Sequence, residues 1–142
     1  MTATIQHIAR GHAIELISNT TAPKLSDVEV EVFARFVKAS LEIWIGSIGE
    51  ELLCMWGLIP PTLLSDQAYL WLHTTEAVKD HEFMLVRRSQ IELAKMLSRF
   101  PLIVGHCEVG ERQSIRWLRW LGAIFGEPGE KLIQFTIRGP NG

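Results

Sequence analysis

His106 and Glu108 stand two residues apart in the apolar run PLIVGHCEV. Neighbouring side chains of a β-strand point to opposite faces, so these two groups would share one face. His73 ends another run of strand character, AYLWLHTT. An imidazole and carboxylate pair with a second imidazole opposite can act as a general base or as a weak metal site. Such residues are also common as plain hydrogen-bonding groups on strands, and the sequence leaves both interpretations open.

A second group of chemically active side chains lies in and just before the segment QSIRWLRWLGAIFGEP. Arg112, Arg116 and Arg119 are spaced four and three residues apart, so on a helix they line one face. Guanidinium groups in a row suit a phosphate-type anion, which Arg112 and Arg116 would bind. The alternatives are a solvated helix face and a helix docked on duplex nucleic acid.

The composition indicates a folded protein with balanced charge. The chain has 142 residues, of which 47% are hydrophobic and 21% charged, and one domain over 1–142 is expected. Fourteen Lys and Arg against sixteen Asp and Glu give a net charge of −2, so nucleic acid is not an expected partner. Cys54 and Cys107 lie in apolar stretches and are expected as buried thiols. No H-x-x-x-H or C-x-x-C spacing supports a metal.

Segments that would send the chain into or across a membrane are not expected. No apolar run reaches the roughly 18 residues that a spanning helix needs. The N-terminal sequence MTATIQHIARGH also lacks the basic and then apolar pattern of a signal peptide. We therefore expect a protein of the cytoplasm, without a membrane partner.

Periodicity and turn residues predict alternating strands and helices. The expected order is a strand region (5–17), a helix (27–40) after a capping box at Ser26 and Glu29, a hairpin (41–61), a strand (68–75), a long helix (76–99), a strand (101–109), a helix (111–121) with Gly122 at its C′ position, and a closing strand (131–139). Alternation of strands and helices after residue 68 predicts a mixed sheet with crossover connections. The expected fold class is therefore α/β in the broad sense, more closely α+β.

The long helix expected from Glu76 to Arg99 has the clearest apolar pattern. Thr74 or Thr75 would cap its first turn. One broad side of the helix collects the apolar residues, and we expect that side to lie on the sheet. Its members are Phe83, Met84, Val86, Ile91, Leu93, Ala94 and Leu97.

The segment SIRWLRWLGAIFGEPGEKLIQFTIRG resembles the last helix and final strands of the GNAT N-acetyltransferase superfamily. In that superfamily a helix of the type A-x-x-x-Y-x-x-x-G-F runs into a Gly-aromatic step, which here is Gly122 to Phe125. The order of elements over 26–138 is also similar. Within the superfamily, IRWLRWLGAIF and FTI look most like GNAT-like proteins of tailed phages, of the internal virion protein A type. The resemblance implies a mostly antiparallel central sheet, splayed at its centre and flanked by helices.

The resemblance also implies acetyl-CoA as a cofactor, with its pyrophosphate on a Gln/Arg-x-x-Gly-x-Gly/Ala loop before the long helix. The matching segment LHTTEAVKDHEFML contains no glycine. Helix N–H groups and the hydroxyls of Thr74 and Thr75 would be the donors there, while Glu76 and Asp80 add negative charge. The tyrosine that the family uses as a proton donor corresponds to Leu118, which has no proton to donate.

Two functions remain open. The first is a phage-encoded, acyl-CoA-dependent N-acetyltransferase with a degenerate cofactor loop, in which His73, His106 and Glu108 deprotonate the acceptor amine. The second is a non-catalytic GNAT-like virion or assembly protein whose partners are other virion proteins or a second copy of the chain. Five tryptophans exceed what one small core readily hides, and aromatic residues are favoured at such contacts. The expected location is the host cytoplasm or the phage particle.

Overall fold

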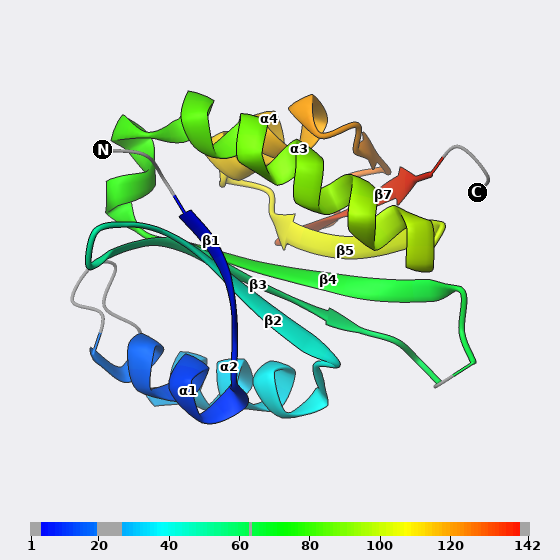
Figure 1. Cartoon of the computed structure of the whole chain (residues 1–142). Helices are drawn as coiled ribbons and strands as arrows, with labels where there is room; N and C mark the ends of the chain where they lie inside the picture. The colour runs from blue at the N-terminus through cyan, green and yellow to red at the C-terminus, as the bar shows by residue number, and fades with distance from the viewer. Residues whose placement is uncertain (1–3, 20–26, 63, 140–142) are drawn as a thin grey trace. The chain divides into compact units, whose positions relative to one another are not determined.

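The computed structural model describes residues 4–19, 27–62 and 64–139 (Figure 1). The expected capping residue Ser26 lies outside the described residues. In chain order the elements are β1 (Thr4–Ile8), α1 (Arg10–Asn19), α2 (Asp27–Ala39), β2 (Glu42–Ile48), β3 (Glu51–Ile59), β4 (Gln67–Thr74), the 3-10 helix η1 (Glu76–Asp80), α3 (Glu82–Arg99), β5 (Leu102–Glu108), α4 (Arg112–Trp120), β6 (Ile124–Phe125) and β7 (Leu132–Arg138).

The strands form one mixed sheet in the order β1-β2-β3-β4-β5-β7-β6. Strands β4 and β5 pair in parallel, whereas β1 with β2, β2 with β3, β5 with β7 and β6 with β7 are antiparallel. This confirms the expected mostly antiparallel α+β sheet flanked by helices.

The chain forms two compact units. The first comprises Met1–Ile59 and Trp71–His81, and the second Pro60–Leu70 and Glu82–Gly142. Strand β4 therefore contributes residues to both units. In the first, α1 and α2 lie side by side against the β2–β3 hairpin; in the second, α3 and α4 lie together over β5 and β7 (Figure 1).

In the first unit, Ser40, which directly follows α2, fixes Trp71 of β4 by a hydrogen bond. The Trp71 indole N–H donates a hydrogen bond to Ser40 Oγ (2.7 Å), and the Ser40 hydroxyl donates to the Phe36 carbonyl (2.6 Å). The Arg10 guanidinium donates to the Ser40 carbonyl (2.8 Å), which ties α1 to the same point. Because its polar atom is satisfied, the Trp71 ring is buried at little cost.

The expected hairpin is present as β2 and β3, with Gly49 at a φ of 58° in the turn. Leu53, Cys54 and Met55 of β3 are fully buried. Burial raises the pKa of the Cys54 thiol to about 12. Cys107 is only half-buried, so the expectation of two buried thiols is confirmed for Cys54 alone.

The first segment is a strand followed by a helix, whereas the sequence predicts one or two short strands. The strand Thr4–Ile8 pairs with β2, and α1 begins at Arg10. Ala13 and Ile17, four residues apart, are both buried. This helical spacing outweighs the loose alternation in the sequence.

In the second unit, α4 packs through its own residues Trp117 and Leu118, whose side chains are 4% and 1% exposed. Gly122 has a φ of 97° and ends the helix as expected. The Gly122 N–H donates to the Arg119 carbonyl (3.0 Å) and the Ala123 N–H to the Leu118 carbonyl (2.9 Å). The helix, the glycine and the closing strand β7 confirm the prediction, while the two-residue strand β6 is an addition to it.

The long helix begins later than the sequence predicts. Residues Glu76–Asp80 form η1, and α3 begins at Glu82 after His81, whose φ of −133° is not helical. The Val78 N–H donates to the Thr75 carbonyl and the His81 N–H to the Val78 carbonyl, three residues back in each case. This tight turn buries Val78 and separates the end of β4 from α3.

The buried side of α3 also differs from the expected one. Its buried residues are Leu85, Val86, Ser89, Leu93 and Met96. Phe83 and Ile91 were expected on the sheet, but their side chains are 71% and 56% exposed, and Ala94 is exposed as well. A narrow stripe of α3 suffices to cover the sheet, so α3 has a second apolar face in solvent.

Three of the five tryptophans belong to the core, while Trp44 and Trp120 remain accessible for the contacts that the sequence predicts. Trp56, Trp71 and Trp117 are each at most 5% exposed, Trp44 is half-buried and Trp120 is 49% exposed. No helix among the described residues has the length and apolarity to cross a membrane.

Gly57→Ala is expected to lower the free energy of unfolding by about 1–3 kcal/mol. The added Cβ would overlap the Trp71 indole, so the ring would have to move away from Ser40. Urea unfolding followed by tryptophan fluorescence measures the loss. Gly110→Ala is the matched control, because nothing lies within 4 Å of its added Cβ. Equal midpoints for the two variants would contradict the packing described here.

Candidate functional site

His106 and Glu108 lie on the same face of β5, as strand alternation predicts, and both are exposed. The nearest described partner of His106 is Tyr69 of β4. The Tyr69 Oη and His106 Nδ1 atoms are 3.4 Å apart, and the ring centroids are 5.8 Å apart. Burial raises the pKa of the Tyr69 hydroxyl. Tyr69 was missed from the sequence because only the parallel register of β4 and β5 brings it beside His106.

His73 lies near the end of β4 in the first unit, among apolar neighbours. Its ring meets Phe33 of α2 edge-on, with centroids 5.7 Å apart. The Nε2 atom is buried and has no hydrogen-bond partner among the residues that the structure describes. Burial lowers the pKa of His73, and the carboxylate of Glu29 opposes that shift. His73 is therefore an imidazole kept neutral, which is the form that a general base requires.

The three expected catalytic residues are distributed over both units. His73 belongs to the first unit, while His106 and Glu108 belong to the second. Their joint action as a base stays a prediction. In the described part of the chain no group of three or more His, Cys, Asp or Glu side chains could hold a metal ion.

Thr75 does not offer the ligand-binding hydroxyl that the sequence predicts. Its hydroxyl donates to the carbonyl of Leu52 (2.6 Å) and lies 3.2 Å from that of Leu53, and its N–H donates to the Leu53 carbonyl (2.9 Å). Thr75 is 6% exposed, so it fastens the end of β4 to β3. Thr74, the other expected donor, is half-buried.

The start of α3 carries an ion pair to α4. The Arg116 Nη2 group donates to both carboxylate oxygens of Glu82, at 3.1 and 3.0 Å, and the same guanidinium lies over the Trp120 ring. Glu82 is the first residue of α3, where a carboxylate also interacts favourably with the helix dipole. Arg116 is thus engaged by an acid of the chain itself, and the sequence could not reveal this pair because its members are 34 residues apart.

The other arginines of α4 do not converge with Arg116 on one point. Arg112 is exposed, and Arg119 lies over the Phe125 ring at 5.4 Å. The expectation that the arginines share a solvated face agrees with the exposure of all three.

The residues at the β4–α3 junction do not fit the pyrophosphate of acyl-CoA. A pyrophosphate needs free donors and a close backbone approach, which glycine permits. Here η1 contains Glu76 and Asp80, the Glu76 carboxylate is paired with Lys79 (2.7 Å), and the Thr75 hydroxyl is already used. Leu118, at the family's tyrosine position, is only 1% exposed. No chemical step can be derived through acyl-CoA from this set of groups.

The parallel ladder between β4 and β5 is short. It joins four residue pairs and ends at Leu70 and Gly105, although β4 continues to Thr74 and β5 to Glu108. The GNAT resemblance implies such an interrupted pair of strands at the centre of the sheet.

Comparison with known proteins gives a clear result for the fold. No family model matches the sequence, and a search of curated proteins finds no match. Solved structures, however, match almost the whole chain. The ribosomal-protein-S5-alanine acetyltransferase from Vibrio fischeri has a TM-score of 0.72 at 8% identity, covering 99% of this chain and 95% of that one. This chain has the GNAT fold.

Two further structures with the GNAT fold agree. A GNAT-family protein from Desulfovibrio desulfuricans gives a TM-score of 0.72 at 8% identity, covering 96% of this chain and 99% of that chain. The GNAT domain of S. lividans PAT gives 0.66 at 14% identity, covering 96% and 90%. At such identities the likeness establishes the GNAT fold and leaves the activity to be argued from the site.

His73 is expected to make the folded protein less stable at acid pH. Its pKa in the folded state lies below the ordinary value of 6.5, so protonation favours the unfolded chain. The contribution of neutral His73 is complete above pH 6.5 and is lost as the pH falls from there through the folded-state pKa. Urea midpoints measured across this range should fall more steeply for the wild type than for His73→Leu, which cannot be protonated. Parallel pH profiles would contradict a half-buried imidazole whose pKa is lowered in the folded state.

Proposed function

We propose that this chain uses the GNAT fold for protein–protein contacts rather than for acyl transfer, as a non-catalytic assembly protein. The observation that carries the proposal is the Glu82–Arg116 ion pair at the start of α3. There the GNAT resemblance expects a bound pyrophosphate, and the chain supplies a carboxylate of its own. The likeness of IRWLRWLGAIF and FTI to tailed-phage proteins adds the expected partners, which are other virion proteins or a second copy of the chain.

Electrostatics supports this proposal. A lone carboxylate would repel a phosphate about 4 Å away by about 1–4 kcal/mol, and the Arg116 charge offsets this repulsion at Glu82, so the ion pair offers a phosphate no net attraction. Glu82 is only 20% exposed, so water screens it incompletely. Arg116, the cation that would attract the phosphate, already neutralises this acid.

The remaining groups support the same proposal. The Thr75 hydroxyl is used in a structural hydrogen bond, and Leu118 occupies the position of the family's proton donor inside the core. A transferase would need both an anchored cofactor and an acid for the leaving thiolate. The Thr75 and Leu118 observations bear on these two requirements independently of each other.

The proposed location follows from the same resemblance. The protein would be found in the host cytoplasm during assembly or in the phage particle itself. Detection of the chain in purified particles by mass spectrometry would support packaging.

Acetyl-CoA is expected to leave the melting temperature of the protein unchanged. A ligand present at 100 times its Kd would add about 2.7 kcal/mol to the stability of a native state that binds it. Differential scanning fluorimetry with up to about 1 mM acetyl-CoA would detect that shift. The Vibrio cholerae spermidine N-acetyltransferase, which shares the fold, serves as the control run in parallel. A saturable rise in melting temperature for this chain would contradict the proposal.

N-acetyl transfer is the second candidate, favoured by the short β4–β5 ladder and by the neutral His73. Structural neighbours with the same fold include a spermidine N-acetyltransferase and ribosomal-protein-alanine acetyltransferases. Primary amines would then be the acceptor class. Incubation with acetyl-CoA and either spermidine or a peptide with N-terminal alanine, followed by mass spectrometry of the acceptor, tests this candidate. Acetylation that His73→Gln abolishes would favour it.

A further inference from the structure

The solvent-facing side of α3 forms a surface hollow with a mixed apolar and cationic lining. The hollow has a volume of about 860 Å³. Its lining residues are Phe83, Met84, Arg87, Arg88, Gln90, Ile91, Ala94 and Lys95. We call this surface the α3 groove. The 71% exposure of Phe83 and the 56% exposure of Ile91 are large for apolar side chains on a helix that already packs its opposite side.

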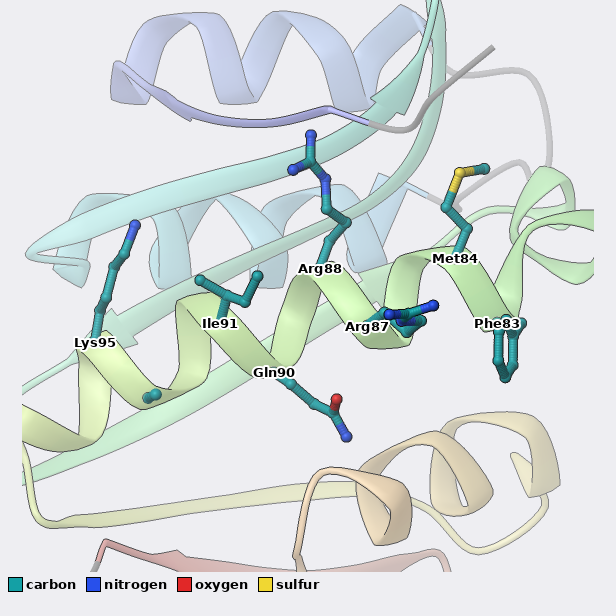
Figure 2. Close-up of a pocket in the computed structure, with 8 residues that line it drawn as sticks. Phe83, Met84, Arg87, Arg88, Gln90, Ile91 and Lys95 are labelled. Carbon is teal, nitrogen blue, oxygen red and sulfur yellow. The ribbon is translucent and has the colours of Figure 1, made fainter.

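The lining residues follow the helix in two rows. Met84, Arg88, Ile91 and Lys95 project along one side of α3, while Phe83 and Gln90 project along the other (Figure 2). In the first row the spacing is four, three and four residues, and in the second row Phe83 and Gln90 are seven residues apart, so both rows follow the repeat of an α-helix. From residue 83 to residue 95 the rows extend for about 18 Å at 1.5 Å per residue. Parallel rows of this length can receive the side chains of one further helix.

The charge of the α3 groove is opposite to that of the whole chain. Its lining contains three cationic side chains and no acidic one, whereas the chain has a net charge of −2. Lys95 is paired with Glu92 (3.3 Å), which lies on α3 outside the groove. Arg87 is exposed beside Phe83 and has no ion pair within the described residues. An occupant that covers the apolar side chains would therefore gain from carrying carboxylates at its edges.

We propose that the α3 groove is a docking site for an acidic, amphipathic helical segment of a partner protein. Its apolar residues would cover Phe83 and Ile91, and a carboxylate at its edge would pair with Arg87. This inference rests on the proposed function, because it names the surface through which the protein contacts its partner. Recognition of a helix by apolar anchors at i, i+4 and i+7 with flanking charges is a common mode of peptide binding.

The same features disfavour the other occupants. Two copies of the chain joined symmetrically through this face would place two cationic linings, neither with an acidic side chain, against each other, which like-charge repulsion opposes. A bilayer is flat and favours a protruding apolar surface, whereas the α3 groove is a hollow with apolar and cationic side chains in its lining. A nucleic acid would leave Phe83 and Ile91 against phosphates instead of apolar groups.

The test uses two synthetic helical peptides of about 16 residues with identical leucine spacing. One carries glutamate on the flanking positions and the other carries lysine. Fluorescence anisotropy of the labelled peptides against the whole protein should give saturable binding of the acidic peptide in the micromolar range, weakening at about 0.5 M salt. The basic peptide should bind at least tenfold more weakly.

Variants distinguish peptide binding in the α3 groove from nonspecific binding. Phe83→Ser should weaken the acidic peptide at least tenfold, and Arg87→Glu should weaken it while strengthening the basic peptide. The matched controls outside the groove are Leu132→Ser, at a 51% exposed residue of β7, and Lys131→Glu. Both controls should bind the peptides as the wild type does. Because Phe83 is 71% exposed, Phe83→Ser should keep the wild-type urea midpoint, so that lost binding cannot be attributed to unfolding.

Three results would overturn the proposal. The first is no saturable binding of the acidic peptide, or equal binding to Phe83→Ser. The second is self-association in sedimentation that Phe83→Ser abolishes, which would assign the α3 groove to a second copy. The third is binding to phosphatidylserine vesicles that depends on Phe83 while the peptides do not bind. The acetyl-CoA melting assay is independent of all three, so failure of the docking proposal and failure of the proposed function can be told apart.

Discussion

The close approach of β4 and β5 at Gly105 is the constraint on which the arrangement of the candidate residues depends. A Cβ at this position would overlap the Leu70 carbonyl and the Phe135 ring, so only glycine lets the strands pair there. Parallel pairing in turn requires a crossover connection, and α3 is that connection. Tyr69 and His106 are brought together by this register. The contact between Tyr69 and His106 in the second unit therefore depends on the glycine at position 105.

The sheet and the start of α3 depend on different kinds of interaction. The sheet and its helices depend on apolar burial, which tolerates many sequences of similar pattern, as identities of 8–14% to GNAT-fold structures illustrate. Anion binding depends on a few donors with specific geometry, and single changes remove it. Glu82 satisfies the positive end of α3 and Arg116 satisfies Glu82, so this end of the helix is stable without a ligand.

The sequence predicts those parts of the structure that local patterns determine. The hairpin, β5, α4, Gly122 and β7 are recognisable because each contains its own periodicity and turn residues. The start of α3 could not be predicted, because Thr75 is fixed by hydrogen bonds to β3 that have no local signature. The exposed side of α3 was missed because apolar residues occur on two sides of that helix, and only the packed structure shows which side faces the sheet.

The candidate site was predictable only in part. Strand alternation gives His106 and Glu108 a common face, and the structure agrees. The contacts that decide what the site can do, Tyr69 with His106 and Glu82 with Arg116, join residues 37 and 34 positions apart. Such pairs depend on strand register and helix docking, which one sequence does not specify.

Because Cys54 in β3 is completely buried, its thiol can serve as a probe of local unfolding. With its pKa raised to about 12, the thiol is almost never ionised in the folded state, and thiol reagents react with the thiolate. Alkylation of the Cys54 sulfur therefore requires β2 and β3 to separate first. The rate of that labelling reports how often the first unit comes apart under native conditions.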